Sequence, residues 1–183
     1  MSDGNGGNIL SRLSQRTAIV AAVVVVAVLG GGFAAFSAIC PCERTPGGWL
    51  FGTVQAEPVS DWGFANQVDL CQIQIRAPLL PHSINLNCFA TSGGDLYLSC
   101  SNCDGKRWSG IAEHNGWARL RLDDTVYPVS LTRIQDPAEM DRSWEARLAK
   151  LNSLEAPFNP PAPIGTPRPD HWWTFRVVSR NVS

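Results

Sequence analysis

The sequence lacks the short motifs that mark the common hydrolytic and nucleotide-hydrolysing sites. It has no G-x-S-x-G elbow, no H-E-x-x-H pair and no Walker-type phosphate loop. Histidine is scarce as well: His82, His114 and His171 stand beside no convincing nucleophile, and we interpret each as a loop or helix-end residue. These absences argue against hydrolases and nucleotide hydrolases, and no catalytic residue is assigned.

An excess of positive charge is also missing. Residues 43–183 carry 13 Lys and Arg against 15 Asp and Glu, and no basic stripe is visible along them. Proteins that bind nucleic acid usually carry a basic patch that neutralises phosphates. The composition therefore argues against nucleic acid as a partner.

Charge is wholly absent from residues 17–39, TAIVAAVVVVAVLGGGFAAFSAI. As a helix this run would reach about 34 Å, enough to cross the hydrocarbon core of a bilayer. A cleaved secretory signal is the alternative, but its apolar region is usually shorter and ends in small residues. Ile39 before Cys40 also argues against a lipoprotein signal. We favour an uncleaved transmembrane helix in the lipid bilayer.

The flanking charges predict the orientation of this helix. Arg12 and Arg16 precede it, which places residues 1–16 in the cytoplasm and the remaining chain in the periplasm or outside the cell. Small residues give the outer half of the helix a smooth face that another transmembrane subunit could approach, unless they only reflect the usual composition of membrane spans. These residues are Gly30, Gly31, Gly32, Ala34, Ala35 and Ala38.

After the helix, we expect a tether with a first strand over residues 40–56 and a single domain over residues 57–183. Its runs mostly alternate between apolar and polar residues, which is typical of β-strands, and a Pro-rich loop covers residues 156–169. The predicted fold class is mainly β with flanking helices, a split β-barrel preceded by one transmembrane α-helix. Pro128 predicts an edge or a break in its strand.

Two helices are expected within this domain. The first covers residues 105–114, with Asp104 as its cap. The second begins at Asp136-Pro137-Ala138-Glu139, which has a cap, a proline at the first helical position and an acid at the third. Its apolar stripe, interpreted as core, consists of Met140, Trp144, Leu148 and Leu151.

VDLCQIQIR and SINLNCFA are expected to pair as a hairpin in which Cys71 faces Cys88 and Ile73 faces Leu86. The opposite face then consists of carboxamides, which suggests a lined cleft or a partner surface, although a merely solvated sheet remains open. These residues are Gln72, Gln74, Asn85 and Asn87.

The stretch YLSCSNCDGKRW, residues 97–108, joins a strand end to a helix start. Free backbone N–H groups at a helix start bind phosphate, and two basic side chains would add charge-assisted hydrogen bonds. An anion pocket is favoured over a merely solvated helix start. The cofactor-binding candidates here are Ser99, Ser101, Asn102, Gly105, Lys106 and Arg107, together with the four carboxamides.

Six cysteines in an exported domain favour disulfides over metal. Cys100 and Cys103 are one candidate pair, and Cys71 and Cys88, opposed in the predicted hairpin, are another. Zinc held by Cys100 and Cys103 with Cys40 and Cys42 is a weaker alternative, because no histidine stands at a fixed offset.

The succession SINLNCFA, DLYLSCS, GKRWSGIAEHNGWARLRL and YPVSLTRI followed by DPAEMDRSWEARL resembles the FMN-binding split-barrel superfamily, which contains the pyridoxamine 5′-phosphate oxidases. The resemblance covers about residues 57–180. It implies a split barrel that binds FMN or a related flavin, with the flavin phosphate near residues 99–107, and a homodimer across the cofactor sites.

Two functions remain. One is a membrane-anchored flavin protein, a candidate flavin-dependent oxidoreductase, that moves electrons or reduces a small molecule. The other is a non-catalytic accessory subunit of a membrane complex that has kept the fold and lost the cofactor.

Overall fold

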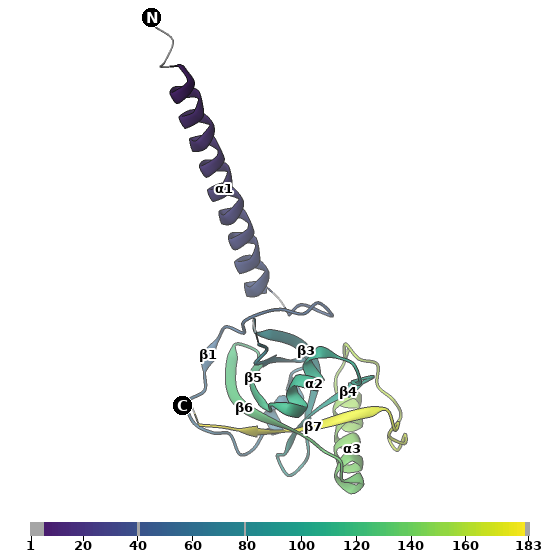
Figure 1. Cartoon of the computed structure of the whole chain (residues 1–183). Helices are drawn as coiled ribbons and strands as arrows, with labels where there is room; N and C mark the ends of the chain where they lie inside the picture. Colours follow the sequence, from purple (N-terminus) through teal and green to yellow (C-terminus); the bar gives the residue numbers. More distant parts are fainter. Residues whose placement is uncertain (1–5, 40, 79, 182–183) are drawn as a thin grey trace, which may run out of the picture.

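The computed structural model of the chain describes residues 6–39, 41–78 and 80–181. A long helix, α1 (Gly6–Ile39), extends away from a barrel that is formed by strands later in the chain (Figure 1). The segment Ser14–Phe36 of α1 is long and apolar enough to cross a membrane, and none of its residues is buried. A signal sequence near an N-terminus meets the same criterion. The orientation of the helix stays a prediction.

Six antiparallel strands form the barrel, in the order β6-β5-β2-β3-β4-β7, and β6 also pairs with β7. This pairing closes the sheet and leaves none of the six as a free edge strand. The predicted fold class is therefore confirmed. The strands are β2 (Cys71–Ile75), β3 (His82–Ala90), β4 (Leu96–Ser101), β5 (Trp117–Leu122), β6 (Thr125–Arg133) and β7 (Trp172–Ser179). A two-residue strand, β1 (Thr53–Val54), pairs in parallel with β6.

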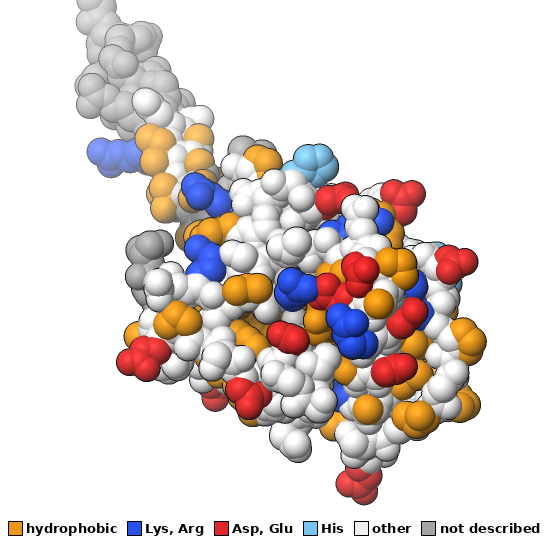
Figure 2. Space-filling model, turned by 90° about the horizontal axis from the view of Figure 1, so that it is seen from below, with side chains coloured by type: hydrophobic (Ala, Val, Ile, Leu, Met, Phe, Trp, Pro, Cys, Tyr) orange, Lys and Arg blue, Asp and Glu red, His pale blue; other side chains and the backbone are white. Residues whose placement is uncertain are grey.

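The apolar sides of the strands meet inside the barrel, where Ile73, Leu98, Leu120 and Phe175 are fully buried. On the end of the barrel away from α1, acidic and basic side chains are interspersed (Figure 2). No large field of one sign forms on that face.

The hairpin of β2 and β3 differs from its predicted register by two residues. Cys71 pairs with Leu86 and Gln72 with Asn85, because the ladder already begins at His82, directly after the connecting residues 76–81. A shift of two keeps every side chain on its predicted face, since side chains alternate with period two. Cys71 and Cys88 are therefore diagonal neighbours and not directly opposed, and they form a disulfide across a Cα–Cα distance of 5.7 Å.

Pro128 neither breaks its strand nor lies on an edge, so that prediction was wrong. It pairs across from Arg119 in a continuous β6, between the part that pairs with β1 and the part that pairs with β7. Its carbonyl accepts a hydrogen bond from Arg180 N at 2.9 Å. On the side of β6 opposite β5, Pro128 thus lies between the residues that pair with β1 and those that pair with β7. The strand continues through the proline at this position.

Helix α2 (Arg107–His114) begins two residues later than predicted, and Asp104 does not cap it. The N-cap residue is Lys106, which makes no side-chain capping bond. The reason is a preceding turn, in which Gly105 has a φ of +75° and Lys106 N donates to Cys103 O at 3.1 Å. That turn occupies the residues that the prediction had placed in the helix.

Helix α3 (Pro137–Ser153) begins as predicted, and the Asp136 carboxylate accepts from Glu139 N at 2.8 Å. Trp144, Leu148 and Leu151 are buried, and Met140 is half-buried. This helix covers one side of the barrel (Figure 1).

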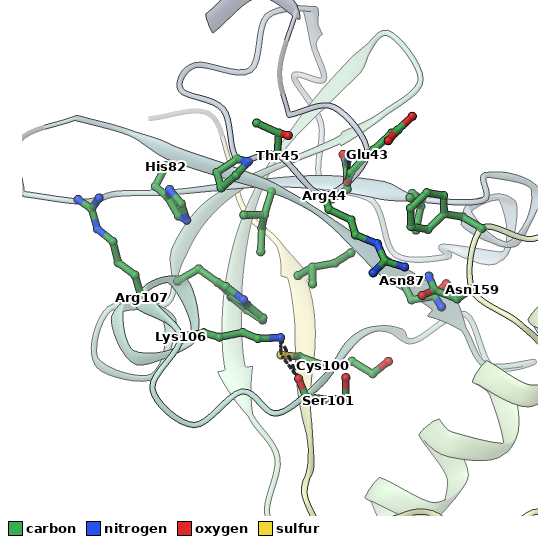
Figure 3. Close-up of a pocket in the computed structure, with 18 of the residues that line it drawn as sticks. Glu43, Arg44, Thr45, His82, Asn87, Cys100, Ser101, Lys106, Arg107 and Asn159 are labelled. Carbon is green, nitrogen blue, oxygen red and sulfur yellow. Dashed lines mark hydrogen bonds between the residues drawn. The ribbon is translucent and has the colours of Figure 1, made fainter. Parts of the chain in front are cut away.

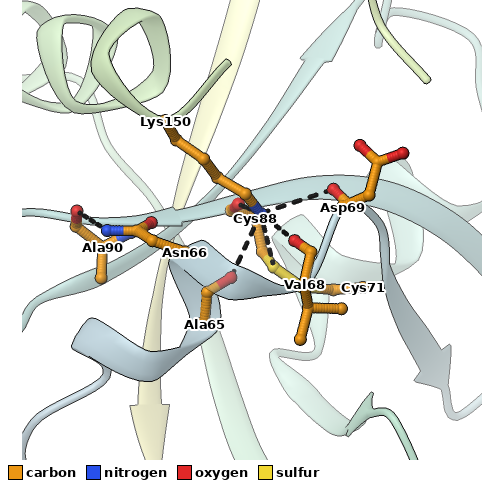
Figure 4. Close-up of a disulfide and its surroundings, with 8 residues drawn as sticks. All are labelled: Ala65, Asn66, Val68, Asp69, Cys71, Cys88, Ala90 and Lys150. Carbon is orange, nitrogen blue, oxygen red and sulfur yellow. Dashed lines mark hydrogen bonds between the residues drawn. A yellow bond between two sulfur atoms is a disulfide. The ribbon is translucent and has the colours of Figure 1, made fainter. Parts of the chain in front are cut away.

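One cation on α3 is buried together with the apolar stripe. Lys150 is 2% exposed, and its ammonium donates to Cys88 O at 2.6 Å and to Ala65 O at 3.2 Å. It also donates to the carbonyls of Val68 and Asp69, beside the Cys71–Cys88 disulfide (Figure 4). Because backbone carbonyls carry partial negative charge, this arrangement satisfies a buried ammonium without a carboxylate. Lys150 thereby ties α3 to β3 and to the short helix η1 (Gly63–Gln67) that precedes β2.

Candidate functional site

The post-α1 segment, residues 41–50, lies on the carboxamide face of β2 and β3. Gln72 Nε2 donates to Pro41 O at 3.0 Å, and Asn85 Nδ2 donates to Glu43 O at 2.8 Å. Gln74, which is 1% exposed, accepts from Leu50 N at 2.7 Å. Three of the four carboxamides, Gln72, Gln74 and Asn85, therefore hold this segment against the barrel, and Asn85 and Asn87 also line a cavity.

A tight turn in this segment forms one wall of a cavity. Thr45 N donates to Cys42 O at 2.8 Å, and Glu43 takes a positive φ of 47° at the turn. The cavity has a volume of about 590 Å³, within the range of roughly 300–1,000 Å³ usual for ligand sites. Its other walls come from β3, β4, the start of α2, α3, the Pro-rich loop and β7 (Figure 3).

Most of the predicted cofactor-binding residues line this cavity, and the others lie outside it. Gln72 and Gln74 hold the post-α1 segment, and Asn102 and Gly105 belong to the turn before α2 without reaching the lining. The predicted residues that the structure brings together here are Asn85, Asn87, Ser99, Ser101, Lys106 and Arg107.

The charged residues of the lining are mostly positive. Glu43 is its single carboxylate, against four cations. His82 lies near Arg107, and burial together with the charge of Arg107 lowers the pKa of His82 (Figure 3). The cations are Arg44, Lys106, Arg107 and Arg147. The cavity is therefore suited to an anion.

Arg147 of α3 is the most deeply buried of these cations, with 6% of its surface exposed. Its guanidinium packs beside two indoles that contact each other, and its Cζ lies 4.8 Å from the ring centroid of Trp144 and 4.5 Å from that of Trp172. Among the described residues it has no carboxylate or hydrogen-bond partner, and its Nε is buried without one. Burial lowers the pKa of Arg147 to about 10, so it remains charged at neutral pH. A buried cation in this state is costly unless a ligand compensates it.

Neutral polar groups at the cavity also lack protein partners. Both side-chain polar atoms of Asn87 and the hydroxyl of Ser99 are buried and make no hydrogen bond among the described residues. The same holds for Asn85 Oδ1. Buried polar groups in native proteins are nearly always satisfied, so these groups indicate a polar ligand or ordered water in the cavity.

Aromatic and aliphatic side chains complete the walls. Trp108, Phe158 and Trp172 line the cavity together with Ile84 and Leu86. Flat rings of this kind bind a planar ligand by stacking. The combined arrangement fits a molecule with an anionic group, polar edges and a planar apolar body.

The Cys100–Cys103 disulfide forms part of the cavity rim. Cys100 lines the cavity, and Lys106 Nζ lies 3.6 Å from its sulfur and 2.8 Å from Ser101 O. Because both sulfurs are in a disulfide, they offer no thiolates to zinc. Of the two other cysteines in that alternative, Cys42 is also disulfide-bonded, and Cys40 lies outside the described residues.

Sequence reasoning missed Arg44, Arg147, Phe158 and Trp172. Each comes from a segment far along the chain from residues 97–108, and the sequence contains no local signal that links them. Arg147 is adjacent to Leu148 in the predicted apolar stripe of α3. A charged residue at that position was the one indication in the sequence that Arg147 could have a functional role.

No protein-family model matches the chain, and no curated protein matches it. Several solved structures are similar to it, and they include the following three. A Listeria innocua protein described as a pyridoxamine 5′-phosphate oxidase has a TM-score of 0.46 and 12% identity, over 64% of this chain and 88% of that one. An FAD-binding protein from Mycobacterium smegmatis has a TM-score of 0.42 and 14% identity, over 67% and 95%. A NimC/NimA family protein from Clostridium acetobutylicum has a TM-score of 0.43 and 10% identity, over 63% and 74%. Identities of this size carry no site residue over to this chain.

Proposed function

We propose that the cavity binds a flavin, FMN or a close relative. In this proposal the protein is anchored in a membrane by α1, its barrel faces the periplasm, and it serves in electron transfer or small-molecule reduction. When bound, a flavin supplies hydride and single-electron chemistry that side chains lack. The residues of this chain would bind and orient it.

The observation that carries the proposal is the uncompensated Arg147. Arg147 is 6% exposed and its guanidinium packs beside Trp144 and Trp172, so its charge is unfavourable unless an anion or a strong acceptor binds it. Arg147 opens onto the same cavity as the unpartnered Asn87 and Ser99. A flavin has both the carbonyl and ring-nitrogen acceptors and the N–H donor that such groups require.

The phosphate of FMN would be bound by the cations at the start of α2. Lys106 and Arg107 stand at the N-terminal end of this helix, where free backbone N–H groups and the helix dipole favour negative charge. Arg44 brings a further guanidinium from the post-α1 segment toward the same cavity (Figure 3). These groups would orient the phosphate, while Asn87 and Ser99 would bind the polar edge of the ring system.

The test uses the full chain, purified in detergent. Its visible absorption spectrum shows whether a flavin co-purifies, and titration calorimetry measures the affinity for FMN and for riboflavin, which lacks the phosphate. We expect FMN to bind, riboflavin to bind more weakly, and Arg147→Met to lose about ten- to a hundredfold in FMN affinity, the equivalent of one charge-assisted hydrogen bond. Arg142→Met is the matched control, because Arg142 is an exposed cation on the same helix.

A colourless protein that binds no FMN at tens of micromolar would overturn the flavin proposal. The accessory-subunit alternative would then take its place. The exposed glycines of α1 favour that alternative, since a Cβ added at Gly30, Gly31 or Gly32 meets no atom within 4 Å. Co-purification of a membrane complex that is lost when these glycines are replaced by Leu would support it.

A further inference from the structure

The two described disulfides both belong to the main core but differ in loop length and in access to the cavity. Cys71–Cys88 joins neighbouring strands over a sequence separation of 17, and both of its residues are 0% exposed. Cys100–Cys103 closes a separation of only 3, between the end of β4 and the turn before α2. A crosslink over so short a loop restricts the unfolded chain less, so its stabilising effect is smaller. Cys71–Cys88 fits a structural role, and Cys100–Cys103 needs a further reason.

Cys100 is reachable from the cavity, whereas Cys103 is not. Cys100 is 4% exposed and belongs to the cavity lining, while Cys103 is 0% exposed beneath the start of α2. Ser109 Oγ donates to Cys103 O at 2.6 Å and fixes this residue against the helix. A reactant in the cavity therefore meets the Cys100 sulfur first.

A cation stands beside that sulfur. Lys106 Nζ is 3.6 Å from Cys100 Sγ, and among the described residues no carboxylate forms an ion pair with it. Ammonium groups and helix N-termini stabilise thiolates and lower thiol pKa values, which makes a cysteine pair reactive. Arg107, the first residue of α2, adds positive charge to the same end of the helix.

We propose that Cys100–Cys103 is a redox-active pair that exchanges with small thiols entering the cavity. The chemistry does not require the cavity ligand to be a flavin. It requires only that Cys100 faces the cavity and that Lys106 stabilises its thiolate.

The exchange takes place in two steps. The thiolate of an incoming thiol attacks Cys100 Sγ, the Cys100–Cys103 bond breaks, and Cys103 leaves with the bonding pair and takes a proton. A second thiolate attacks the external sulfur of the mixed disulfide and releases Cys100 as a thiolate beside Lys106. The two external thiols lose two electrons and become a disulfide, and the protein disulfide gains them and becomes a dithiol. The reverse sequence oxidises the protein pair at the expense of a small disulfide.

The experiment equilibrates the full chain in detergent with buffers of reduced and oxidised glutathione, then quenches with acid and maps alkylated cysteines by mass spectrometry. Cys100 and Cys103 should be reduced under conditions that leave Cys71–Cys88 intact. Reduction of both disulfides together, or of neither before unfolding, would overturn the proposal.

Variants at Lys106 test the role of its charge. Lys106 is exposed, so Lys106→Met and Lys106→Arg should both fold. In the reduced protein at neutral pH, Lys106→Met should slow alkylation of Cys100 by iodoacetamide by roughly three- to tenfold, because the thiolate fraction falls while its nucleophilicity rises. Lys106→Arg should retain the wild-type rate. Equal rates in all three proteins would show an ordinary thiol and refute the assignment.

Discussion

The hydroxyl of Tyr97 on β4 donates to Glu139 Oε1 on the first turn of α3 at 3.0 Å. Arg176 Nε on β7 donates to the same oxygen at 2.8 Å. Glu139 thus joins two strands of the barrel to the helix that presents Arg147. The bond from Arg176, and secondarily that from Tyr97, holds the pKa of Glu139 below its usual range, although burial acts the opposite way.

Glu139→Gln should therefore destabilise the fold in a pH-dependent way. Hydrogen bonds to a charged group contribute roughly 1.5–3 kcal/mol each, so we expect a loss of about 2 kcal/mol at neutral pH. Because folding lowers the pKa of Glu139, its contribution to stability is complete above its pKa in the unfolded chain, about 4.3. This contribution is lost as the pH falls through the lower pKa of Glu139 in the folded protein. Urea unfolding should show that the free energies of unfolding of the wild type and of Glu139→Gln converge at acid pH. Glu145→Gln, an exposed change on the same helix, should have little effect at any pH.

Lys150→Met should also destabilise the protein, because it leaves the carbonyls of Ala65, Val68, Asp69 and Cys88 without their shared donor. Buried groups that lose a hydrogen-bond partner cost about 1–3 kcal/mol each, and we expect a total of about 2 to 4 kcal/mol after relaxation. Urea unfolding at neutral pH measures it, with Arg142→Met as the exposed control. A loss no larger than that of the control would mean that the carbonyls have other partners.

The pH dependence of Lys150 has the same direction as that of Glu139 but falls in the alkaline range. Burial lowers the pKa of Lys150 from 10.5 to about 8, with the charge of Asp69 acting the opposite way. Between these values the unfolded chain binds more protons than the folded one, so the wild type gains stability as the pH rises. From pH 7 to pH 9 the gap between wild type and Lys150→Met should widen by about 1 kcal/mol. A constant or narrowing gap would contradict the lowered pKa.

Local patterns predicted α3 well, because its cap, its N1 proline and its apolar spacing all lie within the helix itself. In β5 the apolar members of the alternating sequence, Ala118, Leu120 and Leu122, are likewise the buried ones. The hairpin register could not be fixed in the same way. Apolar alternation has period two, so registers that differ by two residues bury the same faces, and only the loop length distinguishes them.

The candidate site was predictable only where it is contiguous. Ser99, Ser101, Lys106 and Arg107 lie within nine residues and do meet at the cavity. Arg147 reaches the same cavity from 40 or more residues away, through the packing of α3 against the closed barrel. That packing depends on strand order, which no local pattern encodes.

Two adjacent residues at the start of α2 should separate binding from folding. Trp108 is 4% exposed and packs 5.3 Å from the ring centroid of Phe175, so Trp108→Ala should cost about 3–5 kcal/mol of stability. Arg107 is exposed, and Arg107→Ala should leave stability within about 0.5 kcal/mol while weakening FMN binding about tenfold or more. Thermal unfolding and calorimetry on both variants measure the two effects. A destabilised Arg107→Ala, or an unchanged FMN affinity, would remove Arg107 from the ligand site.

The last prediction concerns the post-α1 segment as a wall of the cavity. Gln74→Leu removes the acceptor of Leu50 N, a group that is otherwise buried with the 1% exposed Leu50. An unsatisfied buried amide costs about 1–3 kcal/mol, which should speed hydrogen exchange across residues 41–50 by about ten- to a hundredfold. Because Glu43, Arg44, Thr45 and Pro46 line the cavity, loosening this segment should also weaken FMN binding several-fold. Gln67→Leu, an exposed change, is the control for both measurements. Faster exchange with unchanged FMN affinity would show that the segment covers the carboxamide face without contributing to the ligand site.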